Sequence, residues 1–118
     1  MTQARFAKLV GKEVVEFDSI EDFMDHLKNG NEFNTKIAFD EVVFDSKTYV
    51  VSTVFLGINH GVKDIDKTDL WFETMVFEMD ADRVINYSDL YCERTLTYDE
   101  AEQNHAKVIE MIKRGEIT

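Results

Sequence analysis

Two long apolar runs, separated by a charged loop, dominate the pattern of hydrophobic and polar positions along the chain. In the first run, alternate positions place Val50, Ser52, Val54, Leu56 and Ile58 on one face and Tyr49, Val51, Thr53, Phe55 and Gly57 on the other. Both faces are largely apolar, which is typical of a central strand covered on both sides. The second run, 70–79, has the same character, so we expect residues 49–77 to form the central hairpin of a sheet.

Both faces of such a hairpin are apolar and must be buried against other parts of the protein or against a partner. Helices predicted elsewhere in the chain would cover one face. A second copy of the protein is the economical candidate for the other, so the pattern predicts a homodimer.

The N-terminal segment predicts a hairpin. Gly11-Lys12 suits a type II′ turn between two short strands within residues 5–17. The apolar spacing there also fits a short helix over residues 4–10, and we prefer the hairpin.

A first helix follows, capped by Asp18 or Ser19. Its apolar stripe consists of Ile20, Phe23, Met24 and Leu27. Gly30 fits a left-handed end of this helix. His26 lies off the stripe, so we expect it to face solvent and assign it no function.

The remaining strands are predicted at residues 35–45, with an irregularity at Asp40-Glu41, and at residues 84–87 and 91–97. Turns are expected at residues 45–47 and 80–82, and a charged loop at residues 59–69.

The last helix is predicted over residues 98–114. Thr97 and Glu100 have the spacing of a capping box, and Gly115 fits the end of the helix. Its apolar stripe consists of Ala101, His105, Val108, Ile109 and Ile112. The whole pattern predicts a single α+β domain over residues 1–118, in which a mostly antiparallel sheet of about five or six strands packs against two helices in the order ββαββββα.

The composition fits a soluble cytoplasmic protein. The chain of 118 residues contains one cysteine, Cys92, which excludes an internal disulfide. No apolar run is long enough to span a bilayer, and residues 1–12 lack the features of a secretory signal. The formal net charge of −11 disfavours direct binding to nucleic acid.

The negative charge is concentrated between Glu13 and Asp45, where ten carboxylates and two lysines give a net charge of −8. We expect an acidic surface that includes Asp22, Asp25, Asp40 and Glu41 and that steers a partner with a basic surface. The alternative is a solvated surface that keeps the protein soluble.

The candidate site residues are polar residues that lie among apolar ones in the sequence. Glu73 interrupts an apolar strand face, His105 lies within the stripe of the last helix, and His60 ends the longest apolar run. Arg94 lies on a neighbouring strand and is within reach of Glu73. These four residues could form a pocket for acid–base chemistry or for a small polar ligand. Alternatively, Glu73 and Arg94 form a cross-strand ion pair and His105 is a core histidine bonded to a backbone carbonyl.

Other site classes find little support. The acidic loop 59–69 lacks the glycine and glutamate of a calcium loop, and no spacing matches a zinc site. Classical nucleotide-binding motifs are absent, and Cys92 has no nucleophile signature. The sequence therefore predicts no metal and no cofactor.

Three segments together carry a resemblance to a known group. They are STVFLGINH (residues 52–60), FETMVF (residues 72–77) and the residues Arg94, Thr97, Glu100, Ala101 and His105. The arrangement S-T-V-F-L-G-x-x-H … F-E-T-M-V-F … R-x-x-T-x-x-E-A-x-x-x-H resembles a group of small, functionally uncharacterised bacteriophage and prophage proteins. The chain departs from that group at Asn59, where Asp is usual, and in its charged loop, which replaces a Gly/Pro-rich one.

The resemblance implies no activity, but it implies a phage setting and the cytoplasm of an infected bacterium. Our leading hypothesis is a non-enzymatic accessory protein that binds a host protein, such as a defence or nucleic-acid-handling factor with a basic surface. A second hypothesis is a domain that binds or hydrolyses a nucleotide signal through Glu73, Arg94, His60 and His105. A third is a minor virion or assembly component.

Overall fold

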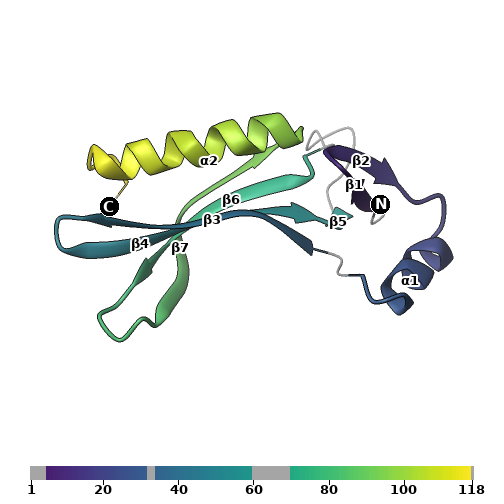
Figure 1. Ribbon diagram of the computed structural model, residues 1–118, viewed down its shortest axis with the longest axis horizontal. Coiled ribbons are helices and arrows are strands. Elements are labelled where there is room, and N and C mark those ends of the chain that lie inside the picture. The colour runs from purple at the N-terminus through teal and green to yellow at the C-terminus, as the bar shows by residue number, and fades with distance from the viewer. Residues whose placement is uncertain (1–4, 32–33, 60–69, 118) are drawn as a thin grey trace.

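The computed structural model describes residues 5–31, 34–59 and 70–117, which form an α+β fold (Figure 1). Its elements are β1 (Arg5–Val10), β2 (Glu13–Glu16), α1 (Ile20–Lys28), β3 (Asn34–Phe44), β4 (Lys47–Leu56), β5 (Ile58–Asn59), β6 (Phe72–Met79), β7 (Ile85–Thr95) and α2 (Tyr98–Lys113). Apart from the two-residue β5, this is the predicted order, and the predicted fold class is confirmed.

The strands are divided between two sheets. A four-stranded antiparallel sheet has the order β3-β4-β6-β7, and a three-stranded sheet has the order β2-β1-β5. The prediction placed five or six strands in one sheet. The division arises at Gly57, where the chain leaves β4 and pairs β5 with β1, so that the Ala7 amide donates to the Gly57 carbonyl at 3.0 Å.

The predicted central hairpin is confirmed. β4 and β6 pair from Thr48↔Met79 to Phe55↔Phe72 and occupy the two central places of the large sheet. Helix α2 lies along one face of this sheet, with its N-terminal end beside the β1–β2 hairpin (Figure 1). Helix α1 lies apart from the large sheet, beyond that hairpin, and contacts β1 (Figure 1).

Two apolar clusters hold α2 on the sheet. The cluster under its C-terminal half consists of Val42, Tyr49, Val51, Val76, Val108, Ile112 and Ile117. The cluster near its N-terminal end consists of Ala7, Phe55, Trp71, Phe72 and Ala101. Each fully buried aliphatic side chain contributes about 1.5–3 kcal/mol relative to exposure, so these clusters determine which face of the sheet is covered.

The opposite face of the large sheet, which we name the open face, has no helix packed on it among the described residues. It is curled enough to bury a small cluster of Val50, Phe77 and Met79, and the Tyr87 ring lies edge-on to Phe77 at 5.4 Å between ring centroids. Elsewhere this face exposes Phe39 and Val43.

Three local predictions need correction. The irregularity in β3 lies between Lys36 and Ala38, at Ile37, which packs against the cluster near the N-terminal end of α2. The predicted strands 84–87 and 91–97 are one strand, β7, with a register shift opposite residues 76–78 of β6. The alternative helix over residues 4–10 is wrong, because residues 7–10 pair with β2 across the Gly11-Lys12 turn.

Both helices begin and end where the sequence predicts. Ser19 caps α1, and Gly30, with φ of +86°, follows its end. Thr97 and Glu100 form the capping box of α2. At its end, the Glu116 amide donates to the Met111 carbonyl and the Gly115 amide to the Ile112 carbonyl, a Schellman motif in which Gly115 has φ of +72°.

Replacing this last glycine tests how tightly the end of α2 packs. In Gly115→Ala, the added Cβ would lie 3.1 Å from the Phe44 ring. We expect a loss of unfolding free energy above the roughly 1–2 kcal/mol that a left-handed alanine costs, measured by urea denaturation. Gly30→Ala is the control, since it has a left-handed φ but no atom within 4 Å of the added Cβ. Equal losses in the two variants would contradict the close contact.

Candidate functional site

The four residues predicted to form one pocket do not come together. Glu73 and Arg94 are cross-strand partners on the open face, whereas His105 projects from α2 onto the other face of the sheet. His60 lies outside the described residues. The sheet therefore separates Glu73 from His105, and the hypothesis of a pocket shared by them is wrong.

His105 is the centre of a buried hydrogen-bonded chain. Its Nδ1 lies 2.7 Å from the Thr53 hydroxyl, which lies 2.8 Å from the Thr74 hydroxyl. Its Nε2 lies 2.8 Å from a carboxylate oxygen of Asp40. The chain spans β3, β4, β6 and α2, and it lies between the two apolar clusters that hold α2 on the sheet.

The carboxylate of Asp40 only accepts, so Nε2 of His105 carries a proton and donates it. In the tautomer with its one proton on Nε2, Nδ1 accepts from the Thr53 hydroxyl, whose oxygen accepts from the Thr74 hydroxyl. An acid, an imidazole and a hydroxyl in series resemble a nucleophilic triad, but the threonine side chains are 0% and 1% exposed. No substrate can reach either oxygen, so the chain positions α2 and does no chemistry.

On the open face, Glu73 and Arg94 form the predicted cross-strand ion pair, with 3.1 Å between Arg94 Nε and Glu73 Oε2. Cys92 is exposed on β7, the strand that also carries Arg94. Partial burial, followed by the nearby Glu73 carboxylate, raises the pKa of the Cys92 thiol. A raised pKa lowers the thiolate fraction at neutral pH, which argues against Cys92 as a nucleophile.

The four residues predicted to form an acidic surface are also dispersed. Asp40 bonds to His105 on the helix-covered face, and Glu41 bonds to Arg83 with 2.8 Å between Oε2 and Nη2. Asp22 and Asp25 remain, both exposed on α1. Asp22 and Asp25 therefore lie together on α1, whereas Asp40 and Glu41, although 54% and 38% exposed, are engaged with His105 and Arg83.

Helix α1 combines its carboxylates with exposed apolar groups. It is attached through Phe23, which is buried against the rings of Phe6 and Phe17. Ile20 and Met24, predicted to be buried, are 52% and 47% exposed. His26 is half-buried beside Phe17, with 5.2 Å between ring centroids, and does not face solvent as predicted.

The exposed side of α1 forms an open hollow of about 580 Å³. The residues lining it are Ile20, Glu21, Asp22, Met24, Asp25 and Lys28. We name this surface the α1 face.

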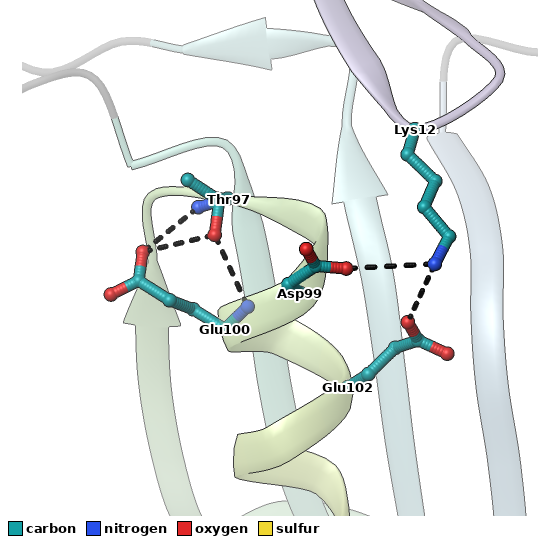
Figure 2. A network of polar contacts seen from close by, with 5 residues as sticks. All are labelled: Lys12, Thr97, Asp99, Glu100 and Glu102. Atoms are coloured by element: carbon teal, nitrogen blue, oxygen red, sulfur yellow. Dashed lines mark hydrogen bonds and ion pairs between the residues drawn. The ribbon is translucent and has the colours of Figure 1, made fainter.

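A second hollow, a cleft of about 550 Å³, lies between the β1–β2 hairpin and the N-terminal end of α2. Trp71 and Tyr98 contribute aromatic surface to it, and Glu13 and Glu16 contribute carboxylates. Figure 2 shows Lys12 reaching from the hairpin towards the first turns of α2. Sequence reasoning did not identify this cleft, because its walls come from three segments that are distant in the sequence, residues 12–16, 71 and 96–98.

Among residues 5–31, 34–59 and 70–117, no group of three or more His, Cys, Asp or Glu side chains is placed to hold a metal ion. No helix among them has the length and apolar character needed to cross a membrane.

The role of the buried chain is tested by removing one hydroxyl. Thr53→Val leaves Nδ1 of His105 without its donor and the Thr74 hydroxyl without its acceptor, so we expect a loss of about 1–3 kcal/mol in unfolding free energy. Urea denaturation measures it. The control is Thr48→Val on the same strand, where the half-buried hydroxyl has no hydrogen bond to a described residue. A loss no larger than in the control would rule out the structural role.

The raised pKa of Tyr91 predicts that the free energy of unfolding decreases at high pH. Burial first, and then the hydrogen bond that its hydroxyl donates to Glu93, raise the pKa of Tyr91 from 10.0 to about 12. The folded state therefore holds the phenol proton more tightly than the unfolded state does. The resulting stability is present below pH 10 and is lost as the pH rises towards 12.

Tyrosinate absorbance measures this titration. We expect Tyr91→Phe to remove a phenol that titrates near pH 12 and to reduce the loss of stability between pH 10 and 12. Glu93→Gln should lower that pKa while leaving the burial in place. An unchanged absorbance titration in Tyr91→Phe would show that this tyrosine is not the shifted group.

Comparison with protein-family models, curated proteins and solved structures finds no match. The resemblance to the phage group therefore stays a prediction.

Proposed function

We propose that the protein is a non-enzymatic accessory protein, in the phage setting that the sequence resemblance implies, and that it binds a host protein with a basic surface through the α1 face. The observation that carries this proposal is that one short helix combines exposed apolar side chains with carboxylates that make no ion pair with any residue the structure describes.

The apolar part of the α1 face offers contact area. Burying the exposed parts of Ile20 and Met24 against a partner would contribute through the hydrophobic effect. Neither side chain is needed to attach the helix, because Phe23 already makes that contact. A surface that combines exposed apolar side chains with charged ones has the composition of a protein–protein interface.

The charged part of the α1 face can attract a basic partner electrostatically. Glu21, Asp22 and Asp25 make no ion pair with any described residue, and Lys28 is the cation nearest to them in sequence. Elsewhere, cations such as Arg5, Arg83 and Arg94 are already paired with carboxylates. The negative potential around α1 therefore favours a basic partner and disfavours a nucleic-acid backbone.

A pull-down from bacterial lysate tests this proposal with Asp22→Asn/Asp25→Asn as bait. The matched control is Asp82→Asn/Asp89→Asn, which changes the net charge equally at exposed positions far from α1 in the sequence. We expect a partner that the wild type and the control capture at low salt, that the α1 variant captures several-fold less, and that high salt releases.

Circular dichroism of both variants checks that α1 remains folded. Identical partner sets for the wild type and the α1 variant would remove the basis of the proposal. Sedimentation of the purified protein measures the oligomeric state in the same preparation, since a homodimer is still expected to cover the open face, where Phe39 and Val43 are 43% and 70% exposed.

A further inference from the structure

The cleft at the N-terminal end of α2 already holds a cation. The Lys12 ammonium lies 3.5 Å from Asp99 Oδ1 and 3.4 Å from Glu102 Oε1 (Figure 2). It also lies 5.3 Å from the centroid of the Tyr98 ring, within the range of a cation–π interaction. Two carboxylates and an aromatic face are the groups that recognise an organic cation.

The charge around the cleft suits a cation and opposes an anion. Arg5 neutralises Glu16 through two hydrogen bonds, of 2.8 and 2.7 Å. Glu13 also lines the cleft, whereas Asp99 and Glu102, which are not among its lining residues, pair with the Lys12 ammonium at its edge. The positive end of α2 does not reverse this balance, because its own capping box and acidic first turn already occupy it.

The cleft also has room for an apolar chain. Its walls include Val14, Trp71 and Leu96, and the Leu96 side chain is 47% exposed. Its volume of about 550 Å³ falls in the range of small-molecule sites. Trp71 is only 3% exposed and has the Arg5 guanidinium 5.5 Å from its ring centroid, so the apolar surface open to an alkyl chain is that of Val14, Leu96 and Tyr98.

Lys12 is held weakly enough to be displaced. Its side chain is 64% exposed at the tip of a two-residue turn, and both of its carboxylate partners are about half exposed or more. The Glu102 carboxylate, followed by that of Asp99, raises the pKa of Lys12, so the ammonium is charged at neutral pH. Exposed pairs of this kind exchange readily with solvent or with another cation.

We propose that the cleft binds organic cations that carry a primary ammonium or guanidinium group on an apolar chain, and that such a ligand displaces the Lys12 ammonium from Tyr98, Asp99 and Glu102. The cation is either a Lys or Arg side chain of a partner or a free alkylamine. The proposal does not rest on binding at the α1 face.

Trp71 supplies the readout, because it is the one tryptophan in the sequence and it lines the cleft. The fluorescence of the full chain is titrated at low salt with n-hexylammonium, with n-hexanol, and with inorganic phosphate. We expect a saturable change with n-hexylammonium and none with the other two. Acetyl-Gly-Lys-Gly-amide and acetyl-Gly-Arg-Gly-amide then separate the two sources. Binding of the peptides identifies a partner side chain, and binding of n-hexylammonium alone identifies a free amine.

Two pairs of matched variants test the role of Lys12. Lys12→Met should lower the Kd for n-hexylammonium about fivefold, whereas Lys47→Met, which removes a similarly exposed paired lysine, should leave it within about twofold. Glu102→Gln should raise the Kd about fivefold, whereas Glu110→Gln on the same helix should not.

Equal responses to n-hexanol and n-hexylammonium would reduce the site to an apolar hollow, and a response to phosphate would assign it to anions. A Lys12→Met protein that binds no more tightly than Lys47→Met would overturn the displacement. Asp22→Asn/Asp25→Asn should titrate like the wild type, so that failure here and failure at the α1 face are distinguishable.

Discussion

The hydrogen-bonded chain through His105 is the constraint on which the arrangement of α2 depends. Apolar contacts alone permit a helix to shift along a sheet, because one aliphatic neighbour replaces another at little cost. A buried imidazole between Asp40 and Thr53 permits no such shift, since any other register leaves polar atoms buried without partners. The chain therefore defines the position of α2, and the two apolar clusters on either side of it supply most of the binding free energy.

The cleft follows from that position. With α2 held by His105, its first turn lies against the β1–β2 hairpin, where Lys12 meets Asp99 and Glu102. The hairpin is held in turn by β5, which continues from β4 beyond Gly57. Thus the small second sheet forms one wall of the cleft and the start of α2 forms the other. Trp71 and Tyr98 also line the cleft.

Most of the fold could be predicted because its signals are local. Alternation along β4 and β6 and the capping box of α2 need no information from distant residues. The site was harder to predict. Alternation shows that Glu73 and Thr74 lie on opposite faces of the sheet, but it does not show which of these faces α2 covers. Glu73 was predicted to be functional because it is a polar residue in an apolar strand. Its neighbour Thr74, however, is the residue that joins the hydrogen-bonded chain through His105. Likewise, the bulge at Ile37 depends on a cluster built from four other elements.

The distribution of charge argues for binding over catalysis. Counting carboxylates between Glu13 and Asp45 overstates the acidic surface, because Glu16, Asp40 and Glu41 each bond to a cation or an imidazole. Of the remaining seven, three lie on α1 (Glu21, Asp22 and Asp25), beside Ile20 and Met24, which are 52% and 47% exposed. The side chains that could act as nucleophiles are poorly placed for catalysis. The threonine hydroxyls beside His105 are buried, and the Cys92 thiol has a raised pKa. This distribution of buried hydroxyls and exposed charged and apolar groups supports the proposal that the protein acts by binding.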